Sequence, residues 1–405
     1  MAEDDIYKSK RRFESFVKRV ETKEILNKID PKDRKRKYYC KNKENLKYFY
    51  KLFNGFKVDD ISFIRRFRIC DVMMFLVDTI ECDLKNAGSK ERDKTIIRLR
   101  DNFTIGQLKR EEGNIKQIGK LLFNNDLPDF FKDFKIKVDV SKIPVRQDKL
   151  TYEEFDKLMK YFSNDSVMQA FLSVSFEALS RPQELFYTKI SDLEINQDYA
   201  IINITTHKKE RAKKLLCIDS KTYLLRMYNS HPDRNNKDAY LFLNKFKQQI
   251  TPFAINKKLR IACNNLGIKK PITAYSLKRF GVTYRRLKGD DENTIMKIAG
   301  WRKNNIRTYD LSDQDDVFKI ELAKRGLIKD EKFKQYLPQN KECPICHQMV
   351  GFADSVCDKC NNIVDPVLIK QKIEASEEQN RKLELFDKFY IKHKEAFEKM
   401  LEEEK

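Results

Sequence analysis

The sequence has no apolar run of the roughly 18 residues needed to span a bilayer. Its first residues, MAEDDIYKSKRR, contain no signal-peptide core. We therefore expect a protein that stays inside the cell, in the cytoplasm. Glycine and proline are also scarce, at 11 and 10 of 405 residues. Residues 1–135 contain few of either, and their apolar residues recur at three- and four-residue spacing, so this stretch is predicted to be helix after helix.

Positive charge, in contrast, is abundant. The chain has 83 Lys and Arg against 62 Asp and Glu, a formal net charge of +21, and 40% of its residues are hydrophobic. That is enough apolar material for cores, and the length indicates two or three domains. A cation excess of this size is typical of a protein with a polyanion partner, most commonly nucleic acid. The alternative is a cationic surface that only maintains solubility, which fits clustered charge less well.

The densest cationic run is 31–51, with nine Lys or Arg against two acids. Tyrosines and phenylalanines alternate with these cations. Aromatics at this spacing are more often core anchors than base-stacking platforms, so only the basic residues count toward DNA binding. The candidate DNA contacts in this run are Arg34, Lys35, Arg36 and Lys37.

A second domain is predicted to follow a linker. Residues 136–150 lose helical periodicity and contain Pro144, as an interdomain linker would. A helix should start at Thr151, because Thr151 and Glu154 make a capping box. The expected fold class is mainly α with a small β-hairpin, an α+β arrangement. Its parts are a helical domain over 1–135, a second domain over 151–330 with strands at 200–204 and 215–218 and helices from about 222, a metal module over 338–365, and a helix over 366–405.

Three basic segments of the second domain carry residues suited to phosphodiester chemistry. They are LSRPQEL at 179–185, YSLKRF at 275–280 and GWRKNNIRTY at 300–309, which holds the only tryptophan of the chain. Fixed cations can grip a phosphate and an oxygen nucleophile can attack it without a metal. Each segment alone is usually a charged helix end or a core residue. Their order and spacing together carry the hypothesis.

In that order and spacing, residues 150 to about 325 resemble the catalytic domain of the tyrosine recombinase, or phage integrase, family. The resemblance implies a helical core-binding domain that clamps double-stranded DNA, followed by the catalytic domain. It also implies strand cleavage and rejoining through a 3′-phosphotyrosyl intermediate, by a homo-oligomer such as a tetrameric synapse on DNA. The sequence has no Gly-x-x-x-x-Gly-Lys loop, which agrees with an exchange that needs no ATP or other nucleotide.

The resemblance assigns roles to individual positions. Arg181 matches the first arginine, Trp301 the His-or-Trp position, and Tyr309 the nucleophile. The hairpin lysine of the family falls on Lys208 or Lys209. Counting back from the second strand favours Lys209, which leaves Lys208 as a DNA contact.

One motif of the family is altered in this sequence. The family has His-x-x-Arg where this chain has Tyr275 and Lys278, with Arg279 one place further on. Lysine lacks the two-pronged hydrogen bonding of arginine, and tyrosine is a poor base at neutral pH. Either Lys278 is the second cation, which we favour, or a local shift brings in Arg279. A recombinase-fold DNA-binding protein with weakened catalysis is the alternative function.

Four cysteines form two Cys-x-x-Cys pairs near the C-terminus: Cys343, Cys346, Cys357 and Cys360. Such a pattern suits a tetrahedral zinc ion. We expect a structural ion because no ligand position is left open, and no catalytic metal. Disulfides are the alternative, and His347 is a competing ligand. Recombinase-like proteins of archaeal type often carry such a zinc ribbon. The helix after it should dock on another subunit or on its own body.

Overall fold

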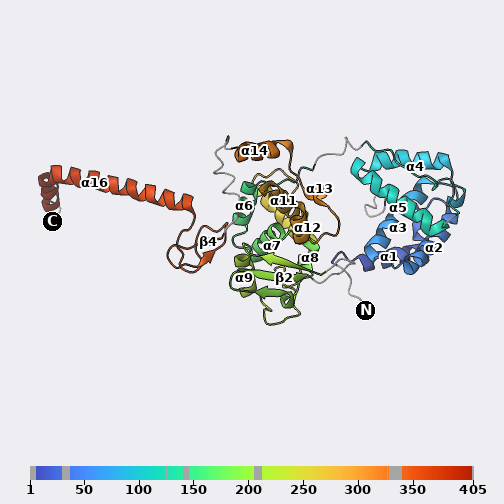
Figure 1. The fold of residues 1–405 in the computed structure, drawn as a ribbon, viewed down its shortest axis with the longest axis horizontal. Helices are drawn as coiled ribbons and strands as arrows, with labels where there is room; N and C mark the ends of the chain where they lie inside the picture. Colours follow the sequence, from blue (N-terminus) through green and yellow to red (C-terminus); the bar gives the residue numbers. More distant parts are fainter. Residues whose placement is uncertain are drawn as a thin grey trace. The chain divides into compact units, whose positions relative to one another are not determined.

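The computed structural model describes residues 6–29, 37–124, 126–139, 146–204, 212–325, 327 and 340–403. The chain divides into two compact units, Met1–Val145 and Arg146–Lys405. Both are mainly helical (Figure 1), which confirms the predicted fold class. Within the described ranges, no helix is long and apolar enough to cross a membrane.

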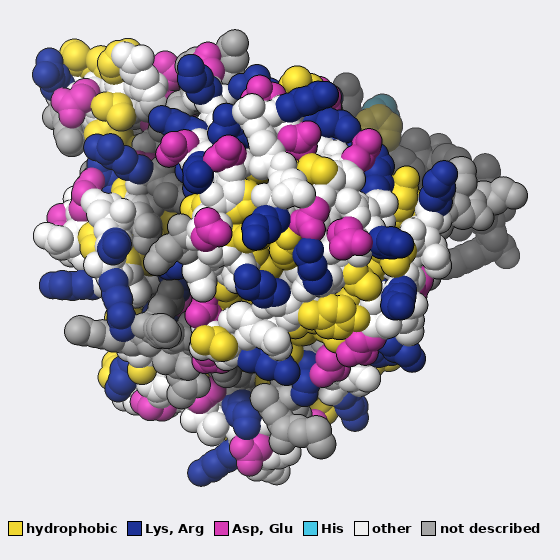
Figure 2. Space-filling model, turned by 90° about the vertical axis from the view of Figure 1, so that its right-hand side faces the viewer, with side chains coloured by type: hydrophobic (Ala, Val, Ile, Leu, Met, Phe, Trp, Pro, Cys, Tyr) yellow, Lys and Arg dark blue, Asp and Glu magenta, His cyan; other side chains and the backbone are white. Residues whose placement is uncertain are grey.

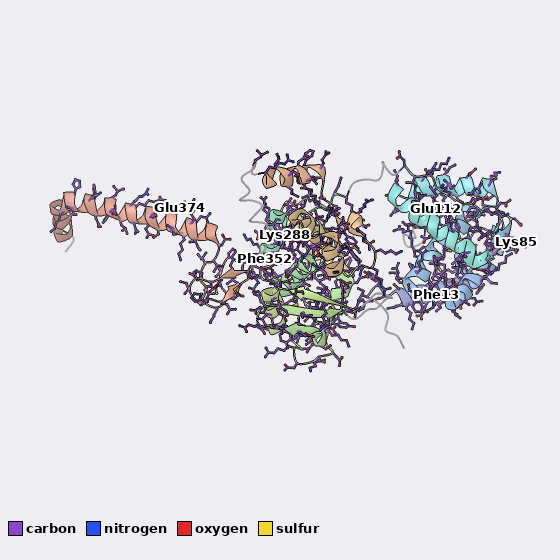
Figure 3. The ribbon with its side chains drawn as sticks, viewed as in Figure 1. Phe13, Lys85, Glu112, Lys288, Phe352 and Glu374 are labelled. Carbon is purple, nitrogen blue, oxygen red and sulfur yellow. The ribbon has the colours of Figure 1, made fainter. Side chains whose placement is uncertain are left out.

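The first unit is built around a central helix. Its helices are α1 (Ser9–Glu21), α2 (Leu46–Val58), α3 (Phe63–Thr79), α4 (Ser89–Asn102) and α5 (Ile105–Phe123), with short 3-10 turns at Glu24–Leu26, Lys43–Asn45 and Leu84–Asn86. From Ile69 to Thr79 almost every side chain of α3 is buried, as expected of a helix surrounded by others. Phe13 of α1 packs edge-on against Phe53 of α2 in the same core (Figure 3).

Most aromatics of the basic run face the core, as predicted. Tyr48 and Phe49 are buried, and Tyr38 packs edge-on against Phe75. Tyr50, in contrast, is exposed. Of the candidate DNA contacts, Lys37 is exposed, whereas Arg34, Lys35 and Arg36 lie outside the described residues.

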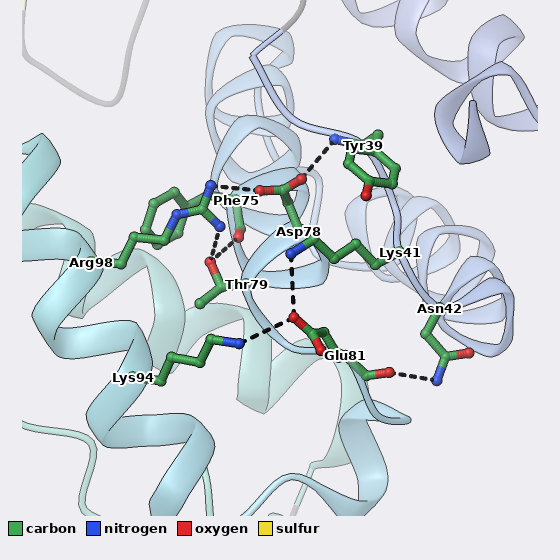
Figure 4. Close-up of polar contacts among 9 residues, drawn as sticks. All are labelled: Tyr39, Lys41, Asn42, Phe75, Asp78, Thr79, Glu81, Lys94 and Arg98. Carbon is green, nitrogen blue, oxygen red and sulfur yellow. Dashed lines mark hydrogen bonds and ion pairs between the residues drawn. The ribbon is translucent and has the colours of Figure 1, made fainter. Parts of the chain in front are cut away.

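The segment that follows Lys37 is fastened to the end of α3 (Figure 4). The carboxylate of Asp78 accepts hydrogen bonds from the Tyr39 backbone N–H at 3.2 Å and from Arg98 Nη2 at 2.5 Å. Next to it, Glu81 pairs with Lys41 and Lys94. Lys37 therefore lies next to a fixed part of the core.

The expected linker begins inside this first core. Ile136 is buried, and its backbone N–H donates to Glu112 Oε2 at 2.9 Å. Glu112 (labelled in Figure 3) also pairs with Lys109 and Lys116. Burial alone would raise the pKa of this carboxyl, but the hydrogen bonds from Lys116, Ile136 and Lys109 lower it to about 2.

The second unit carries a small sheet among helices. Its elements are α6 (Tyr152–Tyr161), α7 (Ser166–Glu177), α8 (Pro182–Phe186), a 3-10 turn at Ile190–Asp192, β1 (Leu193–Ile195), β2 (Ala200–Ile204), β3 (Lys213–Cys217), α9 (Lys221–Asn229), α10 (Pro252–Asn265), α11 (Ala274–Lys288), α12 (Glu292–Ala299), α13 (Ile306–Tyr309), α14 (Gln314–Lys324), β4 (Lys341–Glu342), β5 (Met349–Val350) and α16 (Pro366–Glu403). The predicted capping box starts α6: the Glu154 N–H donates to Thr151 Oγ1 and the Thr151 N–H to Glu154 Oε2.

Two details of this unit differ from the sequence prediction. The antiparallel sheet has three strands in the order β1-β2-β3, because the predicted hairpin gains the short, mostly exposed β1. The helical prediction from 222 onward is wrong between α9 and α10. There the polar sequence after Asn229 makes turns, and isolated bridges join Lys189 to Tyr240 and Leu243 to Gln249.

The last helix, α16, is exposed over most of its described length. Leu383, Phe386 and Phe389 are each more than half exposed, so this described part of the helix does not pack on its own chain. Docking on another subunit stays a prediction. The backbone of His393 leaves helical geometry and kinks the helix.

A close approach between α7 and α11 organises the second unit. A Cβ atom at Gly281 of α11 would lie 2.2 Å from the carbonyl oxygen of Phe176 and 2.6 Å from Leu179 Cδ2. Only glycine permits this contact, which brings the N-terminal half of α11 against the end of α7.

Gly281→Ala should therefore destabilise the second unit by about 1–3 kcal/mol, the usual range for overpacking. Scanning calorimetry should show a lower unfolding midpoint for this unit. Gly113→Ala on α5 is the matched control, because nothing lies within 4 Å of its added Cβ. That control should be neutral or stabilising by about 0.5–1 kcal/mol. An unchanged midpoint for Gly281→Ala would contradict the packing argument.

Candidate active site

Arg181 lies at the turn between α7 and α8. It is the N-cap residue of α8, and Glu184 closes the cap by accepting from the Arg181 backbone N–H at 2.6 Å. The other carboxylate oxygen, Oε1, pairs with Arg181 Nη1 at 3.1 Å. Leu179, just before this turn, has a positive φ of 49°. Such a backbone costs roughly 1–3 kcal/mol outside glycine and is often found at functional sites.

Lys278 of α11 is fully buried beside this turn. Its ammonium group donates to the Leu179 carbonyl oxygen at 2.7 Å. The same nitrogen lies 5.3 Å from the ring centre of Trp301 and 5.4 Å from that of Tyr309. The centres of the Trp301 and Tyr309 rings are 4.9 Å apart. The structure thus brings together Lys278, which stands at the altered His-x-x-Arg motif, Trp301, and the candidate nucleophile Tyr309.

Arg279 points elsewhere, as adjacent residues on a helix must. Its guanidinium pairs with Asp148 at 2.6 Å, and the same carboxylate oxygen accepts from Ser276 Oγ. Burial lowers the pKa of Arg279, while Asp148 opposes that change. Tyr275, one turn before Lys278, is half-buried.

Trp301 follows a glycine turn that ends α12. Gly300 has a φ of 67°, and the Trp301 N–H bonds back to the Met296 carbonyl at 2.9 Å. The ring is buried, yet its Nε1 has no hydrogen-bond partner among the residues that the structure describes. Buried indole N–H groups usually have a partner. Trp301 Nε1 is therefore an exception among buried donors of the described residues.

One apolar cluster holds these parts together: Leu179, Val282, Ile295, Ala299, Trp301 and Ile306. Tyr309, the last residue of α13, packs against it. The hairpin candidates Lys208 and Lys209 lie outside the described residues.

Lys213 is a residue that the sequence analysis missed. It starts β3, and its ammonium group lies 2.8 Å from Glu184 Oε2 and 3.3 Å from the Ala299 carbonyl oxygen. Alternate residues of a strand share a face, and Leu215 and Cys217 of β3 are buried. That period of two was the signal in the sequence that pointed Lys213 inward.

The four cysteines of the C-terminal module lie together. Their sulfur atoms are all within 4.8 Å of one another, with Cys343–Cys360 at 3.5 Å and Cys346–Cys357 at 3.6 Å. Zn–S bonds of about 2.3 Å place tetrahedral sulfurs about 3.8 Å apart, so the cluster is compatible with zinc. These separations are too long for disulfide bonds of about 2.0 Å. His347 is outside the cluster and contacts Glu342.

This module packs against α6 and α9 of the second unit. The Phe352 ring (Figure 3) lies 5.2 Å from that of Tyr223 and 6.1 Å from that of Phe155. Arg226 of α9 pairs at 2.6 Å with both Asp354 and Asp358, and Asp358 lies between two of the clustered cysteines.

Comparison with known proteins agrees with this geometry. Residues 148–314 match the sequence profile of the phage integrase family. The second unit of this chain contains a tyrosine recombinase domain of that family. The resemblance seen in the sequence is thereby confirmed. No curated protein sequence matches the chain.

Solved recombinases share the fold. The Tn1549 transposon integrase in complex with transposon right end DNA has a TM-score of 0.53 at 11% identity, over 69% of this chain and 99% of that one. A lambda integrase dimer bound to a COC′ core site has a TM-score of 0.51 at 13% identity, over 64% of this chain and 76% of that one. At these identities the likeness shows the fold alone.

Proposed function

We propose that this protein is a site-specific DNA recombinase, or integrase, that cleaves and rejoins DNA strands through a 3′-phosphotyrosyl intermediate. The observation that carries the proposal is the convergence of Lys278, Trp301 and Tyr309 beside the turn that leads to Arg181. This arrangement places a cation, an unpartnered N–H donor and a phenol oxygen in one place. Those groups are what attack on a phosphodiester requires.

The reaction exchanges one phosphodiester bond for another. The Tyr309 hydroxyl gives up its proton to water as its oxygen bonds to phosphorus, the bond from phosphorus to the 5′ oxygen breaks, and that 5′ oxygen takes up a proton. Arg181 and Lys278 stabilise the negative charge that develops on the nonbridging oxygens, and Trp301 donates its indole N–H. Lys209 of the hairpin supplies the proton. Attack by the 5′ hydroxyl of another strand reverses these steps, so no nucleotide or catalytic metal is consumed.

Lys278 is the second cation in this proposal, in place of Arg279. Its burial and its contact with Leu179 fix the ammonium group beside the two rings. Arg279 is committed to Asp148. A lysine offers one point charge where an arginine offers a planar fork, so the site should grip phosphate less rigidly than an arginine would.

Double-stranded DNA is the proposed substrate, and a homo-oligomer acts on it. The lambda integrase, which shares the fold with a TM-score of 0.51, has been solved as a tetramer bound to a Holliday junction. The first unit would clamp the duplex through its Lys and Arg side chains, including Lys37. On the face in Figure 2, Lys and Arg side chains are spread, with Asp and Glu among them, so the clustered charge expected from the sequence is not seen on this face.

The cysteine module is proposed to hold one structural zinc ion through Cys343, Cys346, Cys357 and Cys360. Backbone N–H groups of Cys346 and Ile345 lower the pKa of the Cys343 thiol to about 6. A thiolate is the form that binds zinc. Four ligands complete the tetrahedron, so the ion would contribute folding energy and no catalysis.

Tyr309→Phe should abolish the covalent protein–DNA adduct, because it removes the attacking oxygen and little else. Denaturing electrophoresis after incubation with nicked cognate DNA measures the adduct, and a gel-shift assay should show nearly unchanged DNA affinity. An adduct that persists in Tyr309→Phe would reject this tyrosine as the nucleophile. A wild type that binds its site without forming an adduct would favour a binding-only protein on the same fold.

Lys278→Ala should lower the single-turnover cleavage rate by roughly 100- to 1,000-fold, about 3–4 kcal/mol, because a buried cation is lost from the transition state. Arg279→Ala is the matched variant. It should mainly destabilise the second unit, because it leaves the buried Asp148 carboxylate without its guanidinium partner, and it should change the cleavage rate less than Lys278→Ala does. A rate collapse in Arg279→Ala alone would show that the assignment within α11 is off by one residue.

Metal analysis should find one zinc per chain, and Cys343→Ser should lose it, because three thiolates hold the ion far less tightly than four. Removing the zinc should unfold the module locally while leaving magnesium-free cleavage chemistry possible. An absolute requirement for added divalent metal in the cleavage step would contradict the proposed mechanism.

A further inference from the structure

Next to Arg181 lies a carboxylate, Glu184, whose negative charge opposes the binding of a phosphate. Glu184 holds Arg181 by two hydrogen bonds, one to the backbone N–H and one to the guanidinium. Its negative charge also offsets the charge that Arg181 presents to a phosphate. Both side chains are largely shielded from water, at 20% exposed for Arg181 and 13% for Glu184, so this opposition is screened little.

Lys213 neutralises the charge of Glu184. Its ammonium group lies 2.8 Å from Glu184 Oε2, and its side chain is 11% exposed. Two cations and one carboxylate leave one net positive charge at this end of the site. Without Lys213, the pair of Arg181 and Glu184 would be neutral.

The stem of Lys213 also holds the tryptophan turn. Its ammonium group donates to the Ala299 carbonyl at the end of α12. A Cβ atom at Gly300 would lie 2.6 Å from Lys213 Cδ. Gly300 is therefore required twice, for its positive φ and for the room that the lysine stem occupies.

We infer that Lys213 is a positioning residue of the recombinase site: it neutralises Glu184 so that Arg181 acts on the scissile phosphate with its full charge, and it packs the Gly300–Trp301 turn in place. The inference rests on the proposed function. It differs from the hairpin role of Lys209, because Lys213 acts through Glu184 and the turn and contacts no reacting atom.

Lys213→Met tests the charge, since methionine keeps much of the stem and removes the ammonium group. The single-turnover rate of adduct formation should fall by roughly 10- to 100-fold, with DNA affinity within about twofold. Lys214→Met is the matched control, because Lys214 is the exposed neighbour on β3. It removes the same charge and should keep the wild-type rate within about twofold.

Adding Glu184→Gln to Lys213→Met separates charge balance from a merely structural role. Glutamine can still cap the Arg181 N–H, and the double variant again has one net positive charge. It should be faster than Lys213→Met alone. A double variant that is as slow as the single variant, or slower, would overturn the charge-balance role.

Fluorescence tests the packing role without any catalytic readout. Trp301 is the only tryptophan in the chain and is buried, so its emission reports on the Gly300–Trp301 turn. Lys213→Met loses the hydrogen bond to Ala299 but keeps the stem, so it should shift the emission maximum less than Lys213→Ala, which removes the stem and should shift it to the red. An unshifted Lys213→Ala would overturn the packing role. A wild type that forms no adduct would contradict the proposed function, and this fluorescence result would still test Lys213.

Discussion

The second unit depends on one buried ammonium group, that of Lys278. Moving such a charge out of water costs several kcal/mol even after relaxation, so the surroundings must return most of that cost. They do so with the Leu179 carbonyl oxygen, which accepts a hydrogen bond of 2.7 Å from the ammonium group, and with the faces of two aromatic rings. The carbonyl, the cation and the rings come from three separate stretches of chain. A cation that needs all of them keeps α7, α11 and the α12–α13 region together.

The buried Lys278 explains the strained backbone at Leu179. Its positive φ belongs to the turn that carries the carbonyl accepting from Lys278, and its side chain packs in the cluster with Trp301. The close approach at Gly281 brings α11 near enough for that hydrogen bond. Strain, close packing and a buried charge are each unfavourable alone. Together they hold the cation and the rings in fixed positions before DNA binds, which is how electrostatic catalysis avoids reorganisation in the reaction itself.

Local signals in the sequence were sufficient for some of this structure. The capping box at Thr151 and strand β2 were predicted correctly because each depends on neighbouring residues. Strand β3 was predicted at 215–218, whereas it runs from Lys213 to Cys217. The choice between Lys278 and Arg279 was left open because a one-residue shift turns a helix face by about 100°. Only the contact of α11 with α7 decides which side chain faces Leu179. β1 was missed because three mostly exposed residues carry no burial pattern.

Lys213 was missed for a different reason, since lysine is the residue least expected to point inward. Its environment becomes intelligible only when Glu184 and Ala299, distant in the sequence, lie beside it. Because this basic site includes a carboxylate, the number of Lys and Arg residues in the sequence does not give the net charge at the site. The field at the phosphate depends on which cations are left uncompensated.

The cysteine module shows the same dependence on distant partners. Its acids Asp354 and Asp358 face Arg226, and its aromatic Phe352 faces Tyr223, so this side of the module is used within the chain. Packing against α9 ties the cysteine cluster to the rest of the second unit, because Arg226 pairs with Asp354 and with Asp358 of the cysteine loop. A metal ion that orders this loop would then stabilise the surface of the catalytic unit as well as its own module.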